Sequence, residues 1–207
     1  MTLETAGFRT GADIFQQETL EMYGMVNKAL EDMITIRFGE DVWEEVKQAA
    51  GVDIDMFLSN ESYPDNVTYQ LVGAASAALG KPAPELLEAF GVHWVLNTAR
   101  EGYGDLMDAG GKTLDEFLIN LPNFHTRVTL IFPYLQPPRF TCTDITKDQL
   151  RLHYYSSRAG LAPFVVGLLK GLGEMFATPV QIRHVAAKGD GADHDEFLVA
   201  WNQRPPA

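Results

Sequence analysis

The sequence predicts a single α+β domain, because helical periodicity fills the first two thirds of the chain and a period of two follows. The change falls near Pro133, and glycine and proline separate the periodic segments. Four short segments of period two surround one apolar helical segment, in the order β-β-α-β-β. We therefore expect an N-terminal helical subdomain and a C-terminal subdomain with a four-stranded antiparallel sheet and helices.

The predicted helices of the N-terminal part begin and end at recognisable signals. Apolar residues hold a helical stripe from Met22 to Gly39, and a second helix runs from Asp41 to Gly51. A third runs from Val67 to Leu79. The next begins at Lys81-Pro82-Ala83-Pro84, since proline in a first turn loses no hydrogen bond. It places Leu86, Phe90 and Trp94 on one face.

Two more helices are predicted before the sheet. Thr113 and Glu116 have the spacing of a capping box and begin a helix over Leu114–Asn120. Pro122 is expected to break the chain there and to open a separate helix that carries His125.

The strands are predicted as two hairpins. Arg139–Thr143 pairs with Gln149–Tyr155 across a polar turn, and Val180–Ala187 pairs with Glu196–Trp201 across Gly189-Asp190-Gly191. The helix between the hairpins is Leu161–Phe176. In the last strand Phe197, Val199 and Trp201 are each two residues apart and so share one face.

Composition excludes several classes of protein. The 207 residues carry a net charge of −12 with no Lys/Arg cluster, which disfavours nucleic acid and anionic membranes as partners. The single cysteine, Cys142, allows neither an internal disulfide nor a cysteine metal cluster. The longest uncharged apolar run, Ala159–Leu169, is far shorter than the ~20 residues of a membrane helix. The acidic N-terminus lacks the apolar core of a signal peptide, so a cytoplasmic protein is expected.

His125 is the first candidate for chemistry. It shares a predicted helix face with Leu121, Val128 and Phe132. An imidazole among apolar side chains is either a core histidine bonded to backbone carbonyls or a ligand to a metal or cofactor. His125 alone leaves both explanations open.

The second candidate is the alternating set Tyr154, Ser156 and Arg158. On an extended segment the three side chains leave the same face of the backbone. Two hydroxyls and a guanidinium form an anion clamp, because the guanidinium matches a carboxylate or phosphate. The alternative is a strand end whose polar face is simply solvated. Haem would use both candidates, since its iron accepts an imidazole and its propionates need donors.

These residues resemble those of the haem nitric-oxide/oxygen-binding (H-NOX) family, which includes the haem domain of soluble guanylate cyclase. The resemblance depends on His125 in NLPNFHTRV, on Pro138 in YLQPPRF and on the Tyr-x-Ser-x-Arg motif of Tyr154, Ser156 and Arg158. It is strongest for cyanobacterial-type members. It covers residues 22–201 as one haem domain, with residues 1–21 as an extension and 202–207 as a tail.

The resemblance implies haem b (Fe-protoporphyrin IX) between the two subdomains. His125 would be the axial iron ligand, and Tyr154, Ser156 and Arg158 would hold the propionates. Pro138 would press on the macrocycle, although a Pro-Pro pair at such a junction is often only a stiff connector.

The distal residues decide which gas is favoured. Members that hold O2 place a tyrosine hydroxyl over it, and Phe164 occupies that place in this chain. Trp94 is the expected distal aromatic residue, with a core tryptophan as the alternative. Val26 and Met25 would complete an apolar wall.

The resemblance thus implies a haem-based sensor of NO and CO that discriminates against O2 and is not an enzyme. NO would weaken the iron–His125 bond and move the subdomains. The partner would be a separate protein, such as a histidine kinase or a cyclic-nucleotide enzyme. The alternatives are an O2 sensor of the same family and a haem-free ligand-binding module; a haem peroxidase would need a distal acid–base residue that the sequence does not offer.

Three other histidines receive a plainer interpretation. His93 lies about 100° away from the face of Trp94 and is predicted to be partly exposed. His153 is given no role. His194, in Asp190-Gly-Ala-Asp-His-Asp-Glu, is predicted to lie in a solvated acidic turn without fixed ligand geometry.

Overall fold

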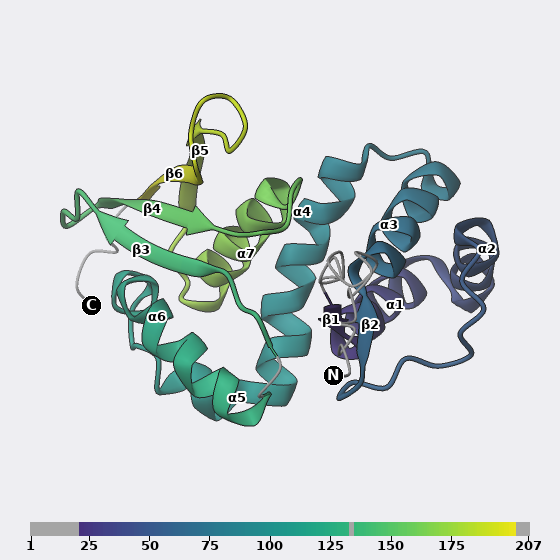
Figure 1. The fold of residues 1–207 in the computed structure, drawn as a ribbon. Helices are drawn as coiled ribbons and strands as arrows, with labels where there is room; N and C mark the ends of the chain where they lie inside the picture. Colours follow the sequence, from purple (N-terminus) through teal and green to yellow (C-terminus); the bar gives the residue numbers. More distant parts are fainter. Residues whose placement is uncertain (1–20, 133–134, 202–207) are drawn as a thin grey trace, which may run out of the picture.

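Two subdomains lie side by side in the computed structural model, which describes residues 21–132 and 135–201 (Figure 1). The predicted extension, apart from Glu21, and the predicted tail lie outside these residues. The helical half holds α1, α2 and α3; the other half holds the sheet with α6 and α7, and α4 runs between them (Figure 1). The elements of the first half are β1 (Glu21–Tyr23), α1 (Gly24–Phe38), α2 (Glu40–Ala50), β2 (Ser62–Pro64), α3 (Asp65–Leu79) and α4 (Ala83–His93). Then follow η1 (Trp94–Ala99), α5 (Arg100–Asp108), α6 (Leu114–Ile131), β3 (Arg139–Thr143), β4 (Gln149–Tyr155), α7 (Ala162–Met175), β5 (Val180–Ala186) and β6 (Asp195–Trp201).

Several of the residues that were predicted to begin or end helices lie at the helix termini. Gly51 and Gly80 close α2 and α3 in the left-handed conformation, with φ of 65° and 60°. Pro84 lies in the first turn of α4. Thr113 caps α6, its hydroxyl accepting a hydrogen bond from the Glu116 backbone N–H at 3.5 Å. The helix boundaries therefore follow from local chemistry.

Two features of the fold were not predicted from the sequence patterns, namely the pair of short strands β1 and β2 and the π-helix η1. The strands β1 and β2 pair antiparallel, but each has three residues, too few for an alternation to be visible. The π-helix η1 continues α4 without a break, and its apolar residues do not distinguish it from an ordinary helix. It begins at Trp94, so the backbone departs from regular α geometry where a distal residue was predicted.

The prediction of two helices separated at Pro122 is wrong, because α6 is continuous through that proline. Proline has no N–H, so the Leu118 carbonyl loses its usual helical partner. The Cys142 thiol, from β3, points at this carbonyl with Sγ 3.5 Å from the oxygen. This contact from the sheet compensates locally for the missing hydrogen bond.

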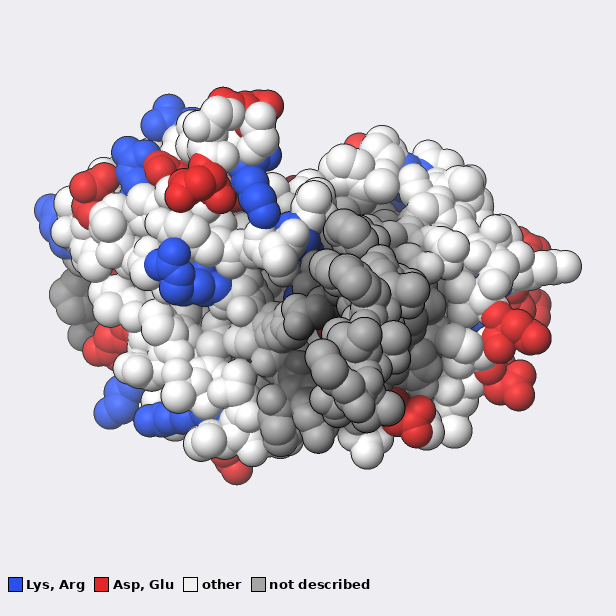
Figure 2. Space-filling model, viewed as in Figure 1, with Lys and Arg blue, Asp and Glu red and all other residues white. Residues whose placement is uncertain are grey.

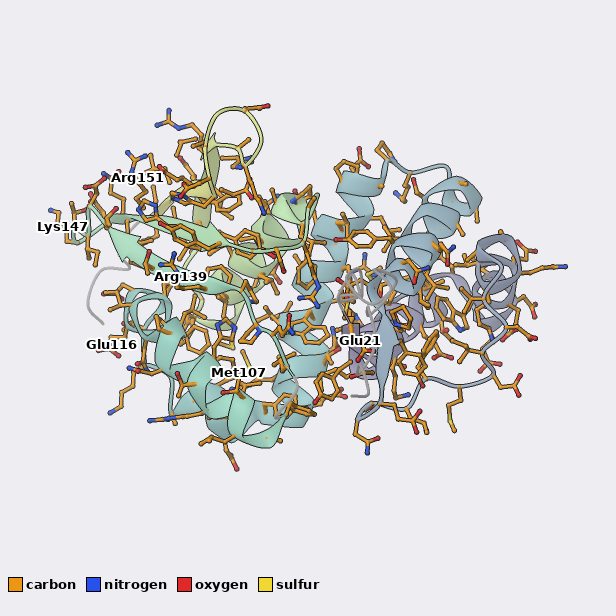
Figure 3. All side chains as sticks on the ribbon, viewed as in Figure 1. Glu21, Met107, Glu116, Arg139, Lys147 and Arg151 are labelled. Carbon is orange, nitrogen blue, oxygen red and sulfur yellow. The ribbon has the colours of Figure 1, made fainter. Side chains whose placement is uncertain are left out.

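The four-stranded antiparallel sheet is confirmed, with the strand order β3-β4-β6-β5. One face is buried against α6 and α7, and Phe197, Val199 and Trp201 all lie on it, as predicted. The opposite face carries polar side chains, and Figure 3 shows Arg151 on that side, with Glu116 of α6 on the other. The sheet thus has one covered face and one polar face.

The crossing of α4 and α7 joins the two halves through glycines. A Cβ added to Gly91 would overlap the Phe164 carbonyl, and one added to Gly167 would overlap the Glu88 carbonyl. Only glycine permits backbones this close. The crossing therefore fixes the distance between α4 and α7.

Charge is unevenly spread over the face seen in Figure 2. Lys and Arg residues gather mainly over the sheet half, whereas acidic residues form the edge beside α2. No helix in the described part of the chain combines the length and the apolar character needed to cross a membrane.

We predict that Gly167→Ala destabilises the fold by about 1–3 kcal/mol, because its methyl group must push α7 away from α4. Thermal unfolding followed by circular dichroism measures the effect. Gly73→Ala on α3 is the matched control, since a Cβ there meets nothing within 4 Å and alanine favours a helix. Equal melting temperatures for the two variants would contradict the close crossing.

Candidate functional site

His125 lies on α6, one turn after Pro122, and its ring faces aromatic side chains. It stacks on Phe140 of β3, with ring centroids 5.5 Å apart and planes 23° apart. Its centroid is also 5.8 Å from that of Phe124. The Nδ1 atom is buried without a hydrogen-bond partner among the described residues. The core-histidine alternative requires such partners, so it lacks support.

The electrostatics of His125 suit a ligand. Burial lowers the pKa of His125 from 6.5 to about 4. The imidazole is therefore neutral at pH 7, and a neutral imidazole offers a lone pair to a metal.

Phe140 connects His125 to the second candidate group. Its ring lies 5.2 Å from that of Tyr154, which is buried in β4. Burial raises the pKa of Tyr154, and a hydrogen bond to Ser156 acts in the opposite direction. Tyr154 is therefore a neutral hydroxyl on the same side of the sheet as His125.

The Tyr-x-Ser-x-Arg motif does not continue as one extended segment. The strand β4 ends at Tyr155, so Ser156 and Arg158 lie in the following turn. There the Ser156 hydroxyl accepts a hydrogen bond from the Arg158 backbone N–H at 3.1 Å. The serine therefore links Tyr154 to Arg158 through a compact turn in place of the predicted strand alternation.

Arg158 faces an acid that the sequence analysis missed. Its Nε and Nη2 donate to the two carboxylate oxygens of Asp65 at 2.7 and 3.2 Å. Nη2 also donates to the Glu21 carbonyl at 2.8 Å, and Nη1 to the Gln136 carbonyl at 3.3 Å. Both charged side chains are only 11% exposed. In the sequence, Asp65 reads merely as part of the breaker Tyr63-Pro64-Asp65.

Three of the four predicted distal residues, Phe164, Trp94 and Val26, pack in one core cluster beside the α4–α7 crossing, and Met25 is not a member of that cluster. Phe164 lies 5.2 Å from Phe90 and 6.4 Å from Trp94, measured between ring centroids. Val26 of α1 packs against the same core cluster. Met25, its neighbour, is half-buried. Phe164 and Trp94 thus form an aromatic wall that the sequence alone does not bring together.

Pro138 lies in the segment that leads into β3, two residues after Gln136, and it is half-buried. Because Gln136 binds Arg158 through its carbonyl, this segment borders the Tyr-x-Ser-x-Arg turn.

Two other residues could be compared with His125 as ligands. The prediction that His93 is partly exposed is wrong, since it is 5% exposed; its Nδ1 lies 3.1 Å from the Asn97 amide nitrogen, and its Nε2 is buried without a partner among the described residues. Burial lowers its pKa, and the nearby charges of Arg37, Asp32 and Glu101 come from α1 and α5. Burial also raises the pKa of the Cys142 thiol to about 11, so it stays protonated at neutral pH.

The residues present fit a haem. A neutral imidazole whose Nδ1 has no partner in the part of the chain that the structure describes would suit a ligand to the haem iron. The buried Tyr154, which is connected to His125 through Phe140, and the half-buried Ser156 and Arg158 suit the carboxylates of a porphyrin. A sequence profile of the haem-NO-binding family matches residues 23–184. The chain belongs to the H-NOX family. Domains of this family bind haem and act as gas-sensor modules.

Similar proteins agree with this assignment. Soluble guanylate cyclase gcy-31 of Caenorhabditis elegans is 30% identical over 162 residues, which is 78% of this chain and 23% of the cyclase. The chain thus spans less than a quarter of that relative. The fold matches an H-NOX protein from S. oneidensis in the Fe(II) state, with a TM-score of 0.81 at 24% identity, covering 89% of this chain and 98% of the other. Its Fe(II)NO form matches with a TM-score of 0.80 at 23% identity, covering 88% and 100%.

We predict that Asp65→Asn lowers the free energy of unfolding by about 3 kcal/mol, because it leaves the buried Arg158 charge without its counter-charge. Chemical denaturation of the haem-loaded protein measures this. The control is Glu88→Gln, which removes an ion pair with Lys170 that also joins the two halves but is about 40% exposed. Such a surface pair is worth about 0–1 kcal/mol. A loss as small as that of the control would show that Asp65 is dispensable.

Proposed function

We propose that residues 22–201 form a sensor that binds ferrous haem b between its two subdomains and detects NO. We expect CO to bind too, and O2 to be disfavoured. The observation that carries the proposal is the half-buried, neutral His125 ring, whose Nδ1 atom is buried and has no partner among the described residues. The domain signals to a separate partner and is not itself a catalyst.

The chain's own residues have the following proposed roles. His125 gives its lone pair to the iron, and Tyr154, Ser156 and Arg158 donate hydrogen bonds to the propionates. Four guanidinium N–H groups of Arg158 already bind Asp65, Glu21 and Gln136. Propionate binding therefore uses the remaining N–H or draws Arg158 partly away from Asp65. Pro138 packs against the macrocycle.

The choice of gas depends on the distal residues. Haem supplies the iron position to which a diatomic gas binds. Bound O2 carries partial negative charge and gains from a hydrogen-bond donor, whereas NO gains little. The α7 segment from Leu161 to Leu169 contains no side-chain hydrogen-bond donor. Phe164 and Val26 add no donor to the wall that they form with Trp94, and the indole N–H of Trp94 is the one side-chain donor among these three residues. We infer that this wall favours NO over O2, with Met25 as a further apolar residue of α1.

The similar proteins support this choice of ligand and partner. The S. oneidensis neighbour is an Fe(II)NO structure, and the curated relatives are soluble guanylate cyclases. We infer that NO is the physiological signal and that a cyclic-nucleotide enzyme or a histidine kinase receives it.

The packing of α6 suggests how the signal leaves the site. The buried residues of α6 are Leu114, Phe117, Leu118 and Leu121, all before Pro122. After Pro122 no residue of α6 is fully buried, and Leu130 is 80% exposed and Ile131 55% exposed, while Phe124 and His125 are half-buried. In the part of α6 after Pro122, His125 is the residue that we propose to bind the haem iron. Weakening of that bond would release a constraint on this part of α6, which could then shift relative to the sheet.

The decisive experiment is the visible spectrum of the purified, dithionite-reduced protein, recorded alone, under air after desalting, and with NO. A five-coordinate ferrous spectrum that is unchanged by air and shifts with NO supports the proposal. A stable oxy spectrum would favour an O2 sensor, and a protein without any haem band, despite ample haem supply, would favour a haem-free module.

We predict that His125→Gly loses most of its haem and regains it when imidazole is added, because free imidazole replaces the missing ligand. The Soret absorbance per chain measures haem content. The control is His93→Gln, which alters a histidine that is fully buried outside the proposed iron site and should retain haem. Full haem content with an unchanged ferrous spectrum in His125→Gly would rule out His125 as the ligand.

We predict that Phe164→Tyr raises O2 affinity at least tenfold, since one hydrogen bond to a charged acceptor is worth about 1.5–3 kcal/mol. The ratio of O2 to NO affinity, from gas titrations, is the readout. Phe164→Leu changes the size of the pocket without adding a donor and should not raise O2 affinity. If both variants gain O2 binding equally, pocket size decides the selectivity.

A further inference from the structure

A second cluster of potential metal ligands lies on the sheet face opposite the haem site. It consists of His153 in β4, His194 just before β6, and Glu196 in β6. His153 and Glu196 are cross-strand partners, while Tyr154, next to His153, points into the core. Arg151, which contacts the cluster, marks this face in Figure 3. The prediction of a solvated turn for His194 is wrong, because its side chain is only 12% exposed.

The three facing atoms are close enough to share one ion. His153 Nδ1 and His194 Nε2 are 2.8 Å apart, and Glu196 Oε1 lies 3.7 Å from the first and 3.4 Å from the second. The circle through these atoms has a radius of about 1.9 Å, which is also about the radius of one face of a tetrahedron with bonds of 2.0–2.1 Å, the Zn–N and Zn–O lengths. A zinc ion fits the triangle with little movement.

Each ligand is held by a further partner, as in established zinc sites. His153 Nε2 lies 2.8 Å from the Thr143 hydroxyl, and His194 Nδ1 lies 2.5 Å from an Asp193 carboxylate oxygen. The second oxygen of Glu196 accepts a hydrogen bond from Arg151 at 2.8 Å. In each of the three side chains, one polar atom thus has a hydrogen-bond partner outside the cluster, and the second polar atom faces the other two side chains.

The orientation of His194 is also fixed by stacking. Its ring lies 4.1 Å from that of Tyr155, with planes 19° apart. The Arg139 guanidinium lies 3.6 Å from the centre of the same tyrosine ring. Because β3 and β6 flank β4, Tyr155 is held between Arg139 and His194. This support makes the histidine a preorganised ligand.

We propose that His153, His194 and Glu196 bind a Zn2+ ion, with water as the fourth ligand. Two imidazoles and a carboxylate are a ligand set that zinc accepts. The ion would bridge β4 to the chain that enters β6. Without it, the two imidazoles share a hydrogen bond that the metal would replace.

The test is Zn2+ binding to the chelator-treated full chain, as purified with its haem, by titration calorimetry and by metal analysis after dialysis. Iron is counted separately. We expect one Zn2+ per chain, and at least tenfold weaker binding in His153→Ala and in Glu196→Gln. Glu196→Gln keeps the side-chain size, and circular dichroism checks that both variants fold.

The matched control is His184→Ala. His184 lies on the neighbouring strand β5 and also contacts a carboxylate, with Nε2 2.9 Å from an Asp195 oxygen, but it is outside the cluster. It should bind Zn2+ like the unaltered chain. No Zn2+ uptake by the unaltered chain, or equal loss in His184→Ala, would overturn the proposal.

Discussion

The ion pair between Arg158 and Asp65 is the contact on which the arrangement of the two halves depends. Arg158 follows β4, Asp65 begins α3, and the same guanidinium also binds carbonyls of Glu21 and Gln136. A buried charge is stable only when its partner and its hydrogen bonds are all present. Arg158 is also the proposed cation for the propionates. Haem binding and the contact between the two halves therefore both depend on Arg158. A change in haem binding would thus alter the contact between the halves, and a change in that contact would alter haem binding.

The glycine crossing of α4 and α7 imposes a second constraint. Because Gly91 and Gly167 let the backbones touch, Trp94 and Phe164 are brought against one another and against Phe90. The apolar character of the proposed distal wall thus depends on residues without side chains. Selectivity for a gas would then be altered either by changing an aromatic residue or by separating the two helices.

Most elements were predictable because their signals are local: glycines after α2 and α3, the Thr113 cap and the alternation in the strands. His125 and the Tyr-x-Ser-x-Arg motif were also singled out, and their roles stay predictions, but the residues around them were not predicted. The role of Asp65 and the burial of His93 depend on residues far away in sequence. The continuity of α6 depends on a neighbouring strand, since the Cys142 thiol approaches the carbonyl that Pro122 leaves free. The histidine cluster of the sheet likewise appears only when β4 and β6 pair.

The proline in α6 also has a mechanical consequence. In the proposed mechanism, a bend of α6 at Pro122 would make residues 122–131 a lever, whose length is about 15 Å at a rise of 1.5 Å per residue. His125 lies about 5 Å from Pro122 and Ile131 about 14 Å from it, so a displacement at the histidine would be magnified about threefold at the end of the helix. A movement of less than 1 Å at the imidazole would thus become a shift of 2–3 Å, at a point where Leu130 and Ile131 already lie on the surface.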